Sequence, residues 1–252
     1  MRVLVTNDDG VTSPGLAMLA EAARGCGMEV TVVAPSEDAS GTGAAMTARV
    51  DDGVVTLAEV TGADGRAAGS LSGGPAFIVR AAMFGAFGPP PDLVLSGINQ
   101  GVNTGKAILH SGTVGAALTA ANYGRRALAL SSAAGSDGSV DVESVDLEVV
   151  ATIVKWVCDT PPGTVLNVNL PAASDGRRAA LDRVRVTSLA GVGTVQGRVT
   201  DARGSVPVVF NDEGGTPESG TDVAALAAGY ISVTAIRSIV EDSRVDLTRI
   251  VG

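Results

Sequence analysis

The chain of 252 residues is poor in the side chains that build zinc sites and nucleic-acid interfaces. It contains two cysteines and one histidine, so no Cys/His cluster is available to hold zinc. It has 18 lysine and arginine residues against 27 aspartate and glutamate residues, which gives a net charge of −9. Sequence-independent binding of DNA or RNA needs an excess of positive charge. We expect no nucleic acid as the main partner, although a small anion can still bind at a locally positive site.

Signals for a membrane or for secretion are also missing. No apolar run approaches the ~20 residues of a transmembrane helix, and the first residues lack the order of charged, apolar and small residues of a signal peptide. Cys26 and Cys158 lie far apart in segments with a helical pattern, which favours two buried free thiols over a disulfide. We therefore expect a cytoplasmic protein, with no membrane partner, that folds around a sizeable core without disulfides.

Up to Pro171 the chain alternates between strand-like and helix-like patterns. Strands are expected at 2–6, 29–33, 93–95, 127–130 and 165–168, and helices at 16–24, 75–87, 114–123 and 140–157. Turn signals at 51–53 and 62–65 flank an expected hairpin or excursion. Repeated βα units predict an α/β fold with a Rossmann-like three-layer core and a mostly parallel sheet.

After residue 171 the pattern changes. Alternating and glycine-rich segments predict hairpins, followed by a short helix at 222–228 and a strand at 230–236. We therefore predict a core at 1–171 and a β-rich C-terminal extension at 172–252, which packs on that core or on a neighbouring subunit.

Four polar loops are the candidates for a functional site. They are Asn7-Asp8-Asp9-Gly10, the loop containing Ser40-Gly41, the segment 96–103 with Asn99 and Asn103, and His110-Ser111-Gly112-Thr113. Because parallel sheets bind ligands at the carboxyl ends of their strands, we expect these loops to converge on one edge.

The residue types in these loops predict metal-assisted attack on a phosphate. Adjacent carboxylates such as Asp8 and Asp9 at the end of a buried strand repel each other unless a cation or a proton lies between them. Two carboxylates, a hydroxyl and an amide oxygen suit Mg²⁺ or Mn²⁺. Backbone N–H groups at residues 111–113, before an apolar helix, favour a phosphate beside the cation. One carboxylate would then accept a proton from the attacking water.

Each of these motifs also has a structural interpretation. Asp-Asp-Gly is usually a turn, and Asp51-Asp52-Gly53 is expected to be one. Asn99 and Asn103 are compatible with left-handed turn positions, a lone histidine such as His110 is most often structural, and Phe77 is compatible with the core.

Three other classes of protein are compatible with parts of the pattern. A phosphatase with an aspartyl nucleophile has an Asp-x-Asp motif, which neither Asp8 nor Asp9 completes. A dinucleotide-binding enzyme has G-x-G-x-x-G after its first strand, where this chain has NDDGVTSPG. A ligand-binding protein without turnover is the third alternative.

Six segments in order carry a family resemblance: NDDG with SPGL (7–16), VVAP with SG (32–41), PDLVLSGIN with G and N (92–103), SGTV (111–114), LNVNLP (166–171), and GTD with GYISVT (220–234). With them, the chain resembles the SurE (survival protein E) family of metal-dependent 5'/3'-nucleotidases. The resemblance implies one divalent metal, Mg²⁺ or Mn²⁺, held by Asp8, Asp9, Ser40 and Asn99. It implies catalytic roles for Asp8, Asp9 and Asn99, with Asp8 as the base or the carboxylate that orients water. It also implies a homodimer or homotetramer formed with the C-terminal extension.

The expected substrate-binding residues are Ser40, Gly41, Asn103, His110, Ser111, Gly112 and Thr113. The chain departs from the family pattern at three positions. Ala39 replaces a basic residue, Phe77 an acidic one and His110 a tyrosine. The expected substrate is a nucleoside monophosphate or a related phosphate ester, such as a modified nucleotide.

Overall fold

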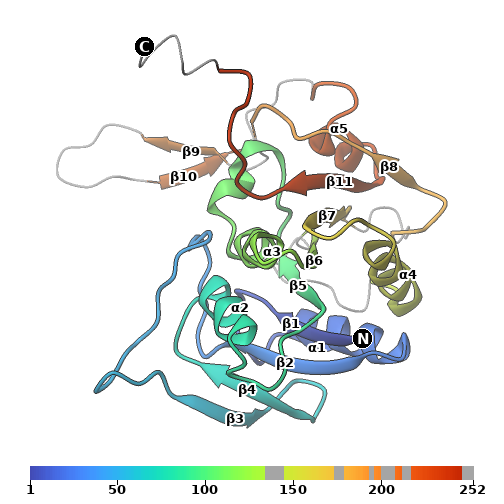
Figure 1. Cartoon of the computed structure of the whole chain (residues 1–252). Coiled ribbons are helices and arrows are strands. Elements are labelled where there is room, and N and C mark those ends of the chain that lie inside the picture. Colours follow the sequence, from blue (N-terminus) through green and yellow to red (C-terminus); the bar gives the residue numbers. More distant parts are fainter. Residues whose placement is uncertain (134–144, 173–178, 193–195, 200–207, 212–216, 246–252) are drawn as a thin grey trace.

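The computed structural model describes residues 1–133, 145–172, 179–192, 196–199, 208–211 and 217–245. Nine strands form one sheet in the order β3-β4-β2-β1-β5-β6-β7-β11-β8, and β9 and β10 form a separate antiparallel pair (Figure 1). The strands are β1 (Arg2–Thr6), β2 (Glu29–Pro35), β3 (Leu57–Thr61), β4 (Ala67–Leu71), β5 (Leu93–Gln100), β6 (Arg126–Ser132), β7 (Thr164–Leu170), β8 (Val184–Val186), β9 (Gln196–Val199), β10 (Val208–Asn211) and β11 (Ile231–Arg237). The helices are α1 (Pro14–Gly25), α2 (Pro75–Met83), the 3₁₀ helix η1 (Gly105–His110), α3 (Gly112–Asn122), α4 (Leu147–Cys158) and α5 (Asp222–Ala227).

The centre of the sheet is parallel, as the βα alternation predicts. Strands β4, β2, β1, β5, β6 and β7 pair in parallel. At one edge β3 pairs antiparallel with β4 in a hairpin whose turn is the second predicted turn signal, at 62–65. Beyond β7, β11 pairs antiparallel with β7, and β8 pairs in parallel with β11.

The two faces of the sheet are covered by different helices, giving the predicted three layers (Figure 1). On β1, Val3 and Val5 pack into a buried cluster with α1 and α4, whereas Leu4 packs into a second cluster with α2 and α3. This alternation follows from the two-residue period of a strand that is buried on both faces. The α/β, Rossmann-like core is therefore confirmed.

The C-terminal part of the chain is attached to the same sheet. Strand β11 pairs with β7 from Ser232–Asn169 to Arg237–Thr164, and the short helix α5 precedes it. The expected division at residue 171 and the role of the extension in assembly stay predictions, and part of the extension lies outside the described residues.

Three elements differ from the sequence-based boundaries. Helix α2 ends at Met83 rather than at 87, because Phe84 caps it and Gly85 has a φ of +83°, which a continuing helix does not allow. Strand β5 runs on to Gln100, five residues past the expected end. Helix α4 begins at Leu147, capped by Asp146, and the first part of the range expected for it (140–144) lies outside the described residues.

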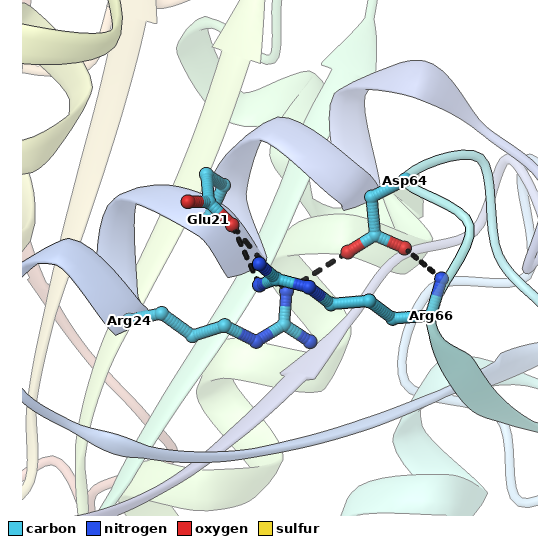
Figure 2. Close-up of polar contacts among 4 residues, drawn as sticks. All are labelled: Glu21, Arg24, Asp64 and Arg66. Carbon is cyan, nitrogen blue, oxygen red and sulfur yellow. Dashed lines mark hydrogen bonds and ion pairs between the residues drawn. The ribbon is translucent and has the colours of Figure 1, made fainter.

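Ion pairs fasten the β3–β4 hairpin to α1 (Figure 2). The Arg24 guanidinium lies 2.9 Å from the Asp64 carboxylate, and the Arg66 guanidinium lies 2.8 Å from the Glu21 carboxylate. The backbone N–H of Arg66 also donates to Asp64, which closes the hairpin turn. These contacts hold the edge strands against the helix that follows the Asp8-Asp9 turn.

The two cysteines have free thiols and are half-buried against the cluster beneath α1 and α4. None of the helices in the described parts of the chain has the length and apolarity needed to cross a membrane.

Candidate active site

The turn that follows β1 is shaped by Asn7. Its side chain is fully buried, donates to the carbonyl of Gly10 and accepts from the N–H of Gly10. Gly10 has a φ of +100°, a conformation that glycine adopts without a Cβ penalty. The two reciprocal bonds fix the carboxylates of Asp8 and Asp9 at the carboxyl end of the central strand.

Asp8 lies against the first turn of α3. Its carboxylate accepts a hydrogen bond from the Thr113 hydroxyl, and Asp8 and Thr113 are almost completely buried. Burial raises the pKa of Asp8, while the hydrogen bonds from the Thr113 side chain and backbone oppose that rise. The ionised form of Asp8 thus relies on donors from α3.

Asp9 has an unsatisfied carboxylate oxygen. Its Oδ2 is buried and, within the described residues, has no hydrogen-bond partner. Burial and, after it, the negative charge of Asp8 raise the pKa of Asp9 to about 7. A buried carboxylate without a partner is costly, so this oxygen is suited to a proton or a cation.

The N-terminus of α3 closes over Asp8. The Ser111 side chain caps the helix by accepting from the N–H of Val114, which leaves the Ser111 O–H free to donate. Gly112 allows the close approach, because a Cβ at this position would lie 2.6 Å from Asp8 Oδ2. The first amides of a helix lack partners inside it, so this end of α3 can bind an anion.

The loop after β2 meets Asp8 from the other side. The N–H of Ala39 donates to the Asp8 carbonyl at 2.8 Å, and the N–H of Gly43 donates to the His110 carbonyl. The Ser40 hydroxyl donates to Asp38, 2.6 Å away, and Gly41 has a φ of +77°. Ser40 is therefore beside the site with its hydroxyl turned to Asp38.

Asn99 and Asn103 lie in the loop after β5. Asn99 donates from Nδ2 to the carbonyl of Gly101, which leaves its Oδ1 as an acceptor. Asn103 donates from its side chain to the Ser131 hydroxyl, and its backbone is bound by Asn167 and Asn169 of β7. Strands β6 and β7 thus hold this loop in place.

The structure thus brings the four sequence-predicted loops together around Asp8 and Asp9. The backbone of Gln100, next to Asn99, bonds Asp9, and this contact lowers the pKa of Asp9 against the rise caused by burial.

His110 is exposed at the edge of the group, and Phe77 packs against the core cluster beneath α2 and α3. In the described residues no group of three or more His, Cys, Asp or Glu side chains gathers to form a metal site, so any ion here would rely on two carboxylates with neutral oxygens.

Comparisons with known proteins match this arrangement. The family model described as survival protein SurE matches residues 3–193. The chain belongs to the SurE family. Relatives include a 5'-nucleotidase SurE of Stenotrophomonas maltophilia, 34% identical over 99% of this chain and 92% of that protein, and a 5'/3'-nucleotidase SurE of Edwardsiella ictaluri, 35% identical over 94% and 90%.

A solved SurE structure shows the same fold. The crystal structure of the SurE protein from Aquifex aeolicus superposes with a TM-score of 0.78 at 30% identity, covering 98% of each chain. The family resemblance inferred from the sequence motifs is therefore confirmed over the whole chain.

Asp222 is a buried residue of this SurE family member that lies outside the four polar loops. Its carboxylate accepts from the N–H of Gly105 at 2.8 Å, from Ala190 at 3.0 Å and from Val223 at 2.9 Å. Gly105 begins η1, which leads into Ser111. The start of α5 therefore anchors the segment that carries the anion-binding end of α3. The signal available in the sequence was the GTD motif, whose aspartate follows a Thr cap.

Gly112→Ala is expected to lower the free energy of unfolding by about 1–3 kcal/mol, because the added Cβ collides with the Asp8 carboxylate. Gly25→Ala is the matched control, since a Cβ at Gly25 meets nothing within 4 Å. Denaturant unfolding of both variants measures the difference. Equal stability of the two variants would contradict the close contact between α3 and Asp8.

Asp222→Asn is expected to cost about 1–3 kcal/mol, since an amide NH₂ cannot accept the backbone N–H groups that the carboxylate satisfies. Asp146→Asn serves as control because Asp146 caps α4 and asparagine caps a helix as well as aspartate. Thermal unfolding of the two variants tests the anchor, and a loss no larger in Asp222→Asn than in the control would refute it.

Proposed function

We propose that the protein is a divalent-metal-dependent phosphomonoesterase that hydrolyses a nucleoside monophosphate or a related phosphate ester by attack of water. The observation that carries this proposal is the buried Asp9 Oδ2, which has no hydrogen-bond partner among the described residues, beside the Asp8 carboxylate at the N-terminal end of α3. The relatives named 5'-nucleotidase and 5'/3'-nucleotidase support the substrate class.

The donor set fits a hard divalent cation. Asp8, Asp9 and the Oδ1 of Asn99 offer only oxygen atoms, and Ser40 adds a hydroxyl from the neighbouring loop. Oxygen donors suit Mg²⁺ or Mn²⁺ rather than zinc, and we propose that these four residues hold one such ion. When bound, the ion would polarise a phosphoryl oxygen and make a bound water more acidic.

The protein groups would position the ester and move the proton. The Ser111 O–H and the Gly112 amide at the start of α3 are placed to donate to phosphate oxygens. We assign Thr113 to the same end of the site, where its hydroxyl and backbone bond Asp8. Asp8, held by the Thr113 hydroxyl, would orient water and accept its proton. We assign Asn103 and His110 to substrate binding together with Gly41, because each stands in one of the loops that carry this group of residues.

We also propose that the C-terminal extension forms the contact of a homodimer or homotetramer and that the protein acts in the cytoplasm. Large apolar side chains on the extension support an interface, because Val186 is 88% exposed and Ile239 is 90% exposed. Sedimentation of the purified protein would test the assembly, and a monomer at micromolar concentration would refute it.

Phosphate release is expected from an aryl phosphate and from nucleoside monophosphates in Mg²⁺ or Mn²⁺, and it should stop when a chelator is added. Asp8→Asn and Asp9→Asn should each lower kcat/KM by at least about 100-fold, the scale of acid–base and metal contributions. Asp51→Asn, in the exposed turn formed by the second Asp-Asp-Gly of the chain, is the control and should keep full activity. Tight binding of nucleotide without turnover would instead support the ligand-binding alternative.

The stability of the metal-free protein should fall as pH rises from about 4 to above 7. The pKa of Asp9 is about 7 in the folded protein and lower in the unfolded chain, so the folded state binds its proton more tightly. The stability that this proton gives is fully present at a pH below the unfolded pKa, and it is lost as the pH rises through the folded pKa. Because a cation can replace the proton, Mn²⁺ should raise Tm more near pH 8 than near pH 5. Asp9→Asn should flatten both trends, and a pH-independent metal effect would contradict this account.

A further inference from the structure

Two arginine side chains at the edge of the sheet contact the same aromatic ring. The guanidinium carbon of Arg183 lies 5.0 Å from the centre of the Tyr230 ring, and that of Arg185 lies 3.9 Å from it. Both distances are within the range of cation–π contacts. Strand β8, which carries Arg185, is the last strand of the sheet, and β5, β6, β7 and β11 lie between it and β1 (Figure 1). The cluster is therefore separate from the candidate active site at the end of β1.

The pairing of β8 with β11 produces this arrangement. The two strands are parallel, with Val184 beside Ile231, and the N–H of Ile231 donates to the carbonyl of Arg183 at 2.8 Å. Arg183 and Tyr230 each directly precede their strand, so they lie side by side. Because side chains two residues apart on a strand share a face, Arg185 lies on the same side of the sheet as Arg183. Both guanidiniums therefore meet the ring on one face of the sheet.

The two positive charges have no acidic partner in the part of the chain that the structure describes. Neither arginine forms an ion pair with an aspartate or glutamate there, although Asp182 is adjacent in sequence. The carboxylate of Asp222 is taken up by backbone N–H groups. The neighbouring segments 186–192 and 223–229 contain no charged residue. Two like charges at one ring repel each other, so an anion bound by both would relieve the repulsion.

Backbone contacts hold both guanidiniums in place while most of their N–H groups stay available. Nη2 of Arg183 donates to the carbonyl of Ala228 at the end of α5 (3.0 Å), and Nη1 of Arg185 donates to the carbonyl of Val184 (3.2 Å). A guanidinium has several further N–H donors, arranged to match the paired oxygens of a phosphate. Arg185 is exposed and Arg183 is half-buried, so both are accessible to a ligand in solution.

The size of the cluster favours a small anion. Two charges among neutral residues are too few for a nucleic acid, whose binding draws on many phosphate contacts. A diphosphate carries at least two negative charges on two phosphoryl groups, which provides one group for each guanidinium. The cluster therefore matches a diphosphate in charge and in number of binding groups.

We propose that Arg183, Arg185 and Tyr230 form a second anion site, which binds a diphosphate, either free pyrophosphate or the diphosphate of a nucleotide. Each arginine binds one phosphoryl group, and the Tyr230 ring keeps the two guanidiniums in place. This inference does not depend on the proposed phosphatase function.

Calorimetric titration of the intact chain with pyrophosphate, and separately with ADP, tests the site. The protein is first freed of metal on a chelating resin, so that Asp8 and Asp9 hold no cation that attracts an anion. About one equivalent should bind per chain, and Arg183→Gln and Arg185→Gln should each raise Kd at least about tenfold, the scale of hydrogen bonds to charged groups. Tighter binding of pyrophosphate would identify the free ion as the ligand and tighter binding of ADP a nucleotide, and both results support the site.

Arg244→Gln is the matched control, because it removes an exposed arginine that is paired with Asp242 at 2.7 Å. It should change Kd by less than about twofold. Ser111→Ala removes a phosphate donor of the candidate active site and should also leave the titration unchanged. Arg185 contacts only its neighbour's backbone and the ring, so Arg185→Gln serves alone if the loss of the α5 contact unfolds Arg183→Gln.

Three results would overturn the second site. They are no saturable binding of either ligand to the wild-type protein, equal Kd values for the wild type and the folded arginine variants, and a loss of binding in Ser111→Ala in place of the arginine variants. The last result would place the anion at the end of α3.

Discussion

Two adjacent carboxylates at the end of the central strand, Asp8 buried and Asp9 half-buried, are the constraint around which this site is built. Neighbouring buried charges of one sign are unfavourable, and Asp8 and Asp9 are held in this arrangement by the Asn7–Gly10 turn. Asp8 is compensated by donors from Thr113, whereas one oxygen of Asp9 has no partner in the part of the chain that the structure describes. The asymmetry leaves one side of the pair open to a cation, next to a helix end that favours an anion.

Segments far apart in the chain supply the remaining parts, and hydrogen bonds join them. The loop after β2 is tied to Asp8 by Ala39, and the segment after β5 is held by Asn167 and Asn169 of β7. Asp222 adds a contact from the C-terminal part of the chain to Gly105. The extension is thus part of the support of the active-site region as well as an expected interface.

Much of the fold and the membership of the site could be predicted from sequence, because periodicity and strand-end motifs are local signals. The NDDG turn, a helix start at residues 111–113 and the parallel core all follow from such signals. The end of α2 was misplaced because the apolar pattern continues through Phe84 to Phe87, while the backbone at Gly85 turns away. The Ser40 contact with Asp38 and the Asp222 anchor depend on loops meeting in space, which no local pattern encodes.

The central claim is that Asp8 and Asp9 are arranged for one divalent cation. Anomalous scattering from crystals soaked in Mn²⁺ tests it most directly, because the signal locates the ion without any assumption about substrate. The account predicts one strong peak per subunit in contact with the carboxylates of Asp8 and Asp9. Ordered carboxylates with no peak between them, or a peak bound only at other residues, would contradict it.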